Sequence, residues 1–470
     1  MKIPRRFTAA LAALSLIASN AAPLFALEPV TVSVSKIKDL NIRIYGFVET
    51  DMISDTTAGY TEEMDTVAPA TRNTTTAAAG GTGTGVTNFA GQTHRSIGSI
   101  RNSRLGFEFN VPKTDSGLAT KGVFEMDLMG NNAPNTAPGS APGAQSERDF
   151  FNNPAVRVRH AYVDLTYQDD FNAKVGQYWS LLGWQPYYFP GETVVLPSPG
   201  MLYRRFMQAR GTYTLHPMAD WTLESAIDAA KPAEMNSGAP ESHAGLRLAS
   251  TKYKAASVSG SGTTMLGLSG AASGALIPVH TQSIGSPTGT AYAFDAAIPL
   301  IPSSDGKSRD NNLIWIGEFV AGSGLGGLEI AGQTFGVGGV TTTSTNPQGN
   351  NVSPVGTPID SGIAGVNLDG QAELIKSRTF RSNLQYTTEH WALGGGYAQS
   401  EARNLSRFSF GAKAFALYPK VQFGYVTAFY DPLNWLRFAA EVNQTRATWN
   451  DPANRYSTNN RYQFTTFFLF

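Results

Sequence analysis

Polar and apolar side chains alternate with a period of two in several segments of the chain. In Ser103–Val111, Leu105 and Phe107 fall on alternate positions, with Arg104 and Glu108 on the positions of opposite parity. Successive side chains of a β-strand point to opposite faces, so this spacing predicts a strand with one apolar and one polar face. The same pattern recurs in the segments 121–128, 207–215, 221–228, 380–386 and 436–443.

The lengths of the connections distinguish a membrane barrel from a soluble sandwich, which also alternates. Short turns lie at 112–117, 168–171, 216–220, 388–390 and 431–434, and long polar stretches lie at 54–101, 130–154, 180–203, 229–242 and 322–376. Short periplasmic turns and long external loops are typical of outer-membrane barrels. We therefore predict an all-β fold, a transmembrane antiparallel β-barrel of about 16 strands, with 14 or 18 as alternatives.

The N-terminus has the three parts of a secretory signal. Lys2, Arg5 and Arg6 precede an apolar stretch at 7–17 and a small-residue stretch at 19–26. The apolar stretch is shorter than the about 20 residues that a spanning helix needs, although a retained N-terminal anchor is the alternative. The predicted organisation is a signal peptide at 1–26, a short periplasmic segment at 27–40 and a barrel at 41–470.

Composition supports the barrel and excludes several other classes. Aromatic residues make up 11% of the chain and charged residues only 15%, against about 25% in ordinary soluble domains. Without residues 1–26 the chain holds 33 basic residues (36 minus 3) against 36 acidic ones, which argues against nucleic-acid binding. There is no cysteine, so disulfides and thiolate sites are excluded, and no cofactor is expected. The loop carboxylates Glu62, Glu63 and Asp65 are either solvated or a surface Ca²⁺ site.

The last strand carries the sharpest single signal. Tyr462, Phe464, Phe468 and Phe470 lie on one face of an alternating segment that ends the sequence. A final aromatic residue on an amphipathic last strand resembles the signal read by the barrel assembly machinery. These four residues are therefore the predicted assembly signal, with a chance terminal Phe as the alternative.

The stretch at about 180–204 is too apolar and aromatic for a loop that extends into water. We predict that it folds inward and narrows the lumen. The alternative is a loop that packs over a neighbouring subunit.

Four landmarks in the first half of the chain resemble a known family. They are Arg101–Phe107, Val156–Tyr162, Gly176–Ser180 and Arg204–Arg210, in this order. The sequence resembles the DcaP-like porins of Gram-negative outer membranes, mainly over residues 42–215. The resemblance implies a 16-stranded trimeric porin that takes up small carboxylates, with arginines near its constriction. A periplasmic coiled coil associated with DcaP has no counterpart here, because 28–39 contains no sustained heptads.

Eight charged residues in the first half of the chain are the predicted pore lining. Arg157 and Arg159 share one strand face, and on a lipid face each would cost about 2–4 kcal/mol near the midplane, so the lumen is favoured. The predicted constriction residues are Arg104, Glu125, Asp127, Arg157, Arg159, Arg204, Arg205 and Arg210. In the alternative interpretation, the arginines pair with Glu125, Asp127 or Asp164 and only stiffen the wall.

Strict alternation fails at one point of this lining. If Arg157 and Arg159 point inward, Val163 and Leu165 should point inward as well. Either a β-bulge near His160 resets the phase, or this strand faces a subunit interface.

These patterns together predict an outer-membrane porin, a passive diffusion channel for small hydrophilic solutes that prefers small anions such as carboxylates. Its expected partners are outer-membrane lipid and lipopolysaccharide, the barrel assembly machinery, further copies in a homotrimer, and the solutes. A plugged barrel that acts as an adhesin or scaffold is the first alternative. A barrel hydrolase that uses His160 is the second, although the sequence has no H-E-x-x-H, G-x-S-x-G or Walker motif.

Overall fold

The computed structural model describes residues 30–34, 37–57, 94–130, 155–193, 197–231, 238–279, 287–326, 344–345, 351–352, 363–367, 369, 371–407, 419–448 and 456–470. The predicted signal peptide at 1–26 and the loop carboxylates Glu62, Glu63 and Asp65 lie outside the described residues. In the described part of the chain, no helix is long and apolar enough to span a bilayer.

Nearly all of the described residues lie in β-strands or in short connections between them. The strands are β1 Val30–Val34, β2 Ile37–Asp55, β3 Arg95–Ser99, β4 Arg104–Val111, β5 Leu118–Gly130, β6 Ala155–Tyr167, β7 Phe171–Trp179, β8 Arg205–Met218, β9 Trp221–Ala230, β10 Glu241–Ser259, β11 Gly262–Pro278, β12 Thr288–Ile301, β13 Asn312–Ser323, β14 Ser344–Thr345, β15 Asn351–Val352, β16 Ala364–Val366, β17 Ala372–Leu374, β18 Lys376–Thr387, β19 Trp391–Ala402, β20 Lys420–Leu433, β21 Leu436–Thr448 and β22 Tyr456–Leu469. Two single-turn 3-10 helices, Leu182–Trp184 and Leu405–Arg407, complete the list.

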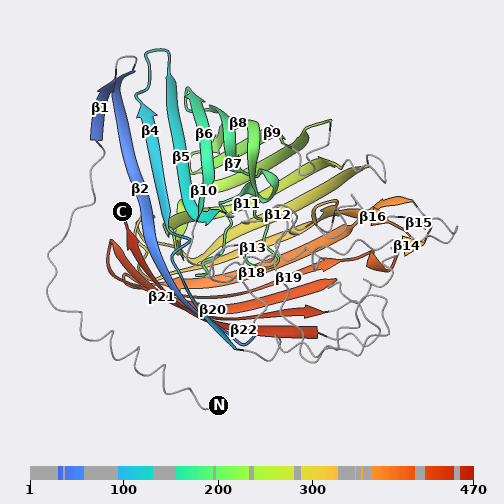
Figure 1. Ribbon diagram of the computed structural model, residues 1–470. Helices are drawn as coiled ribbons and strands as arrows, with labels where there is room; N and C mark the ends of the chain where they lie inside the picture. The colour runs from blue at the N-terminus through green and yellow to red at the C-terminus, as the bar shows by residue number, and fades with distance from the viewer. Residues whose placement is uncertain are drawn as a thin grey trace, which may run out of the picture.

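The strands close into an antiparallel barrel with 16 positions around its wall (Figure 1). Closure joins β2 to β22, where Val48 pairs with Phe468 and Met52 with Phe464. β3 and β4 share one position beside β2, and β1 pairs with the start of β2. The predicted transmembrane barrel and its count of 16 strands are confirmed.

Two boundaries differ from the sequence prediction. β3 lies inside the stretch 54–101 that was predicted as a loop, because Arg95–Ser99 pairs with Asp51–Asp55 of β2. β1 and the first residues of β2 lie within 27–40, which was predicted as a periplasmic segment. Both differences arise because β2 is long. Its 19 residues pair with β1 near one end and with β3 at the other end.

Burial in this barrel is the inverse of that in a soluble protein. Glu49 and Asp51 on β2 are buried, whereas Val48 and Met52 on its other face are exposed, Met52 at 71%. The same division holds on β22, where Arg461 is buried and Phe468 is exposed. Lipid outside the barrel requires an apolar outer face, and a polar lumen requires a polar inner face.

A β-bulge in β6 resolves the phase problem of the arginine strand. Glu125 of β5 pairs with His160, and the next residue, Met126, pairs with Val158, so Arg159 has no partner of its own. Arg159 and His160 are consequently both buried on the inner side, and Val163 returns to the outer face at 48% exposure. Of the two explanations for the failed alternation, a β-bulge near His160 or a subunit interface, the structure contains the β-bulge.

The loop between β7 and β8, described at residues 180–193 and 197–204, lies across the barrel interior and is named the inserted loop here. Its backbone forms hydrogen bonds with inward-pointing side chains of four other wall strands, β11, β13, β18 and β21. The contacts are Gly183 N to Ser273 Oγ at 2.9 Å, Leu202 N to Glu318 Oε1 at 3.4 Å, Thr379 Oγ1 to Gly200 O at 2.7 Å and Thr193 N to Glu441 Oε2 at 2.7 Å. This loop therefore covers the inner faces of β11 to β21. None of these four contacts involves the β4–β8 wall.

The turn end of the β10–β11 hairpin also enters the lumen. The pairing of the two strands shifts between Ala249 and Lys254, and the hairpin beyond this irregularity, residues 254–267, is named the β10–β11 tip here. Val258 at the tip packs with Phe47 of β2 and Phe467 of β22, which lie on nearly the opposite side of the barrel. No local pattern in the sequence predicts this feature.

Candidate functional site

Four arginines from three strands meet on the inner face of the β4–β8 wall. They are Arg104 of β4, Arg157 and Arg159 of β6, and Arg205 at the start of β8, and they are named the arginine cluster here. Neighbouring strands bring them together because Arg104 pairs with Asp127 of β5, and Asp127 pairs with Arg157. The β6 bulge then turns Arg159 toward the same point.

Two carboxylates of β5 lie among these guanidinium groups. Asp127 accepts hydrogen bonds from Arg157 at 2.8 and 3.0 Å and from Arg159 at 3.0 Å. Glu125 accepts a 2.7 Å hydrogen bond from Arg159 and lies 3.6 Å from Arg104. The pairing that was the alternative interpretation is thus present for these residues.

Pairing among the described residues does not neutralise the cluster. In this part of the chain, four guanidinium groups and two carboxylates give a net charge of +2. The Arg157 side chain keeps 30% of its surface exposed, so part of this positive charge faces the open lumen.

Aromatic side chains that the sequence analysis did not single out hold the cluster in place. Trp179 at the end of β7 lies under the Arg205 guanidinium at 4.7 Å and under that of Arg159 at 5.8 Å. Tyr203, on the inserted loop, lies 5.3 Å from the Arg205 guanidinium and packs against Trp179. Burial by itself raises the pKa of the Tyr203 phenol, but the arginine cluster outweighs it and the pKa is lowered. The phenol oxygen therefore marks a position where negative charge is stabilised.

Two of the predicted constriction residues lie outside this cluster. Arg204 forms an ion pair with Glu241 of β10 at 3.2 Å and stacks on Phe206. Arg210 donates a 2.6 Å hydrogen bond to the Trp179 carbonyl oxygen and lies 3.4 Å from Asp228. In each case the guanidinium has a neighbouring carboxylate that compensates its charge.

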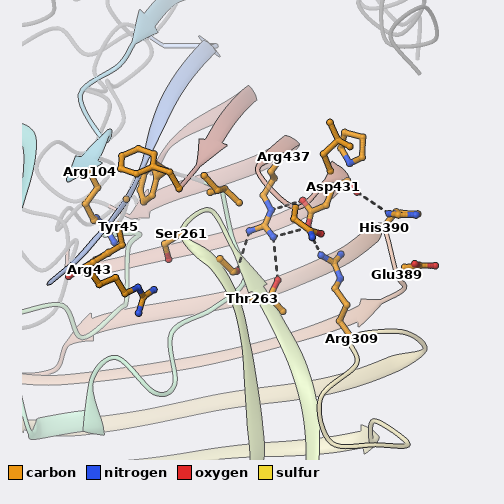
Figure 2. A pocket seen from close by; sticks show the side chains of 18 of the residues that line it. Arg43, Tyr45, Arg104, Ser261, Thr263, Arg309, Glu389, His390, Asp431 and Arg437 are labelled. Atoms are coloured by element: carbon orange, nitrogen blue, oxygen red, sulfur yellow. Dashed lines mark hydrogen bonds and ion pairs between the residues drawn. The ribbon is translucent and has the colours of Figure 1, made fainter. Parts of the chain in front are cut away.

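A vestibule of about 500 Å³ lies next to the cluster, toward the barrel end that carries the short turns (Figure 2). Figure 2 shows Arg43, Tyr45 and Arg104 on one side of it and Arg437 on the other, with Ser261 of the β10–β11 tip between them. Arg104 of the cluster and the neighbouring Glu125 also line the vestibule. The arginine-lined wall is therefore continuous from the inserted loop to the vestibule.

Neither a metal site nor a serine–histidine pair is found in the described residues. No group of three metal-ligating side chains occurs among them. His160 is buried between Trp179 and Tyr178, and its Nδ1 has no hydrogen-bond partner in the described part of the chain. The structure thus offers the hydrolase alternative no activated nucleophile at His160.

The predicted assembly signal lies where the alternation places it. Tyr462, Phe468 and Phe470 are exposed on the outer face of β22, and Phe464 lies half-buried on the same face. Phe470 also exchanges backbone hydrogen bonds with Gly46 of β2, at 2.9 and 3.1 Å. Recognition of this strand by assembly factors stays a prediction.

The comparisons with known proteins bear on the fold. No family model matches the chain, and no curated protein matches its sequence. Among solved structures, the chain is similar to the outer membrane channel DcaP of Acinetobacter baumannii, with a TM-score of 0.59 and 14% sequence identity over 94% of this chain and 99% of that one. It is also similar to an anion-selective porin from Comamonas acidovorans, with a TM-score of 0.50 and 8% identity over 92% of this chain and 100% of that one. The resemblance to DcaP-like porins is therefore confirmed at the level of the fold.

Proposed function

We propose that this protein is an outer-membrane porin, a passive diffusion channel whose narrow part prefers small anions such as carboxylates. The observation that carries the proposal is the arginine cluster on the inner face of the β4–β8 wall, where, among the described residues, four guanidinium groups outnumber the two carboxylates that they contact. Fixed positive charge in a narrow passage with low-dielectric walls concentrates anions and disfavours cations.

The division of the lumen supports the same proposal. The inserted loop covers the inner faces of β11 to β21, so solutes have to pass along the β4–β8 wall. That wall carries the arginine cluster, of which the Arg157 side chain is 30% exposed. A planar guanidinium fork binds a carboxylate through two parallel hydrogen bonds, which favours small carboxylates over spherical anions.

The cellular setting belongs to the proposal as well. The apolar outer face fits lipid, the N-terminal segment 1–26 fits a signal peptide, and both favour an outer-membrane location. A homotrimer is proposed on the resemblance to DcaP-like porins alone.

The test is conductance of the purified, refolded protein in a planar lipid bilayer with a KCl gradient. A steady current with a reversal potential on the chloride side is expected, and an added small dicarboxylate should interrupt that current. A reversal potential on the potassium side would reject the preference for anions and keep the channel. No current from protein that is shown to be folded would reject the channel, and the plugged adhesin or scaffold would then replace it.

A further inference from the structure

The β10–β11 tip is packed on both of its faces. Ala255, Ala256 and Val258 are fully buried, although neighbouring residues of a strand point in opposite directions. A wall segment would expose every second residue to lipid, as Leu246 and Leu248 do earlier in β10. The tip therefore lies between two surfaces inside the lumen.

The surface on one side of the tip is the inserted loop. Leu181 and Trp184 of the loop pack in one apolar cluster with Ala255 and Leu266 of the tip. A Cβ on Gly191 of the loop would lie 2.5 Å from the Val258 carbonyl oxygen, so a larger residue would push the two apart. The loop and the tip thus form one packed body within the barrel.

The surface on the other side is an apolar patch on the opposite wall. Phe47 of β2, Phe429 of β20 and Phe467 of β22 point inward and are buried around Val258. Large apolar side chains are unfavourable on a surface that faces water, and their inner position is explained only by a partner that covers them. The tip is that partner, because the same cluster contains Val258.

Polar side chains of the wall bind the backbone of the tip. Gln385 of β18 accepts a 2.6 Å hydrogen bond from Val258 N and donates one of 2.9 Å to Val258 O. Arg437 of β21 donates to the carbonyl oxygens of Ser259 and Gly262 while Asp431 holds its guanidinium from behind (Figure 2). These contacts give the tip a fixed position across the lumen.

We propose that the β10–β11 tip is a second constriction of the channel, which blocks the lumen over the inner faces of β18 to β22. Solutes then pass through the vestibule, which Ser261 and Thr263 of the tip line together with Arg43 and Arg104 of the wall. The tip thereby sets the conductance and prolongs the contact of solutes with the arginine-lined wall. This inference rests on the proposed channel function.

The first experiment removes the tip. Lys254 pairs directly with Gly267, so replacement of residues 255–266 by Asn-Gly closes the hairpin with a two-residue turn at an existing register position. We expect single-channel conductance to rise at least about twofold and the preference for chloride over potassium to fall, because a wider passage weakens both steric and electrostatic selection. Unchanged conductance and selectivity in the folded variant would overturn the proposal.

The second experiment loosens the tip without removing it. Gln385→Ala deletes both hydrogen bonds to Val258 and should increase conductance and current noise. Asn383→Ala is the matched control, because Asn383 is an inward, buried amide two residues away on the same strand. Equal conductance and current noise in the two variants would count against a role of Gln385 in fixing the tip.

The third experiment places a reporter in the passage and does not depend on the folding of a shortened chain. The sequence has no cysteine, so Ser261→Cys supplies a single thiol in the vestibule, and Ser116→Cys supplies one in an exposed periplasmic turn outside it. A charged methanethiosulfonate reagent added on the periplasmic side should reduce the Ser261→Cys current by at least about half and leave the Ser116→Cys current unchanged. A current unaffected at Ser261→Cys would overturn the proposal.

The outcomes separate this inference from the channel function. A conducting wild type whose current the shortened tip leaves unchanged refutes only the constriction. A silent wild type with a conducting shortened variant refutes free diffusion through the native protein and supports the obstruction by the tip. Two silent, folded proteins refute both.

Discussion

Neutralising two members of the arginine cluster should reduce the anion preference without disturbing the fold. Arg157→Gln leaves Asp127 bound to Arg159 at 3.0 Å, so no carboxylate of β5 loses its last partner. Arg205→Gln removes a guanidinium whose Nη1 makes no hydrogen bond among the described residues. The double variant changes the charge of the cluster with its two carboxylates from +2 to 0.

The size of the effect follows from Coulomb's law. A unit charge about 8 Å from a permeating ion contributes about 0.5 kcal/mol at the dielectric constant of water, so two charges contribute about 1 kcal/mol. At 0.1 M salt the Debye length of about 10 Å reduces this to roughly 0.5 kcal/mol. Chloride loses this stabilisation and potassium loses the same amount of repulsion. The chloride-to-potassium permeability ratio should therefore fall about fivefold, since 1.4 kcal/mol corresponds to a factor of about ten.

Reversal potentials at 0.1 M and 1 M KCl measure the ratio, and a shift in size on an unheated gel shows folding. At 1 M the Debye length is only about 3 Å, and the difference between variant and wild type should nearly vanish. Arg446→Gln is the matched control, because Arg446 is exposed on the outer face, stacked on Tyr456 at 3.7 Å. An unchanged ratio at 0.1 M, a loss that persists at 1 M, or an equal loss in the control would refute the electrostatic reasoning.

Three further predictions concern the wall, the loop and the last strand. Met52→Arg should lower the free energy of unfolding in lipid vesicles by about 2–4 kcal/mol relative to Met52→Leu, because the exposed Met52 side chain faces lipid; equal urea midpoints would show that it does not. Burial and the nearby Glu441 raise the pKa of Glu192, on the inserted loop, from 4.5 to about 8, so the folded state retains a proton that the unfolded chain releases. Stability should therefore fall as the pH rises from about 4.5 to about 8, and Glu192→Gln should remove this part of the pH dependence of unfolding, whereas an identical dependence in both proteins would contradict the assignment. Phe470→Ala keeps the backbone bonds to Gly46 but should reduce the amount of barrel recovered in the outer-membrane fraction, and an undiminished yield would argue against an assembly signal.

Much of the wall could be predicted from the sequence because its rules are local. The side chain of a strand residue points inward or outward according to its parity, so alternation alone placed Phe468 and Met126 outward and Glu125 inward. The inward direction of Arg157 and Arg159 followed from the cost of a charge in lipid. The failure of strict parity near His160 indicated a bulge or an interface, and only the register of β5 and β6 distinguished them.

The interior could not be predicted in the same way, because it is decided by residues on opposite sides of the barrel. The sequence predicts Arg204, Arg205 and Arg210 alike as constriction residues, but Arg204 and Arg210 lie beside Glu241 and Asp228, carboxylates of β10 and β9 that only the folded sheet brings close to them. Tyr203 and Trp179 join the site only through the path of the inserted loop.

The β10–β11 tip shows the same limit most clearly. Apart from Val258, residues 255 to 262 are alanine, serine and glycine, with no alternation that predicts a wall strand. The inward Phe47, Phe429 and Phe467 contradict the rule of a polar lumen until the tip covers them. The sequence by itself determined a membrane barrel and the direction of its wall residues, since these depend on each residue's own preference for lipid or water. The tertiary structure alone decided what fills the lumen, since that depends on which distant surfaces exclude water from one another.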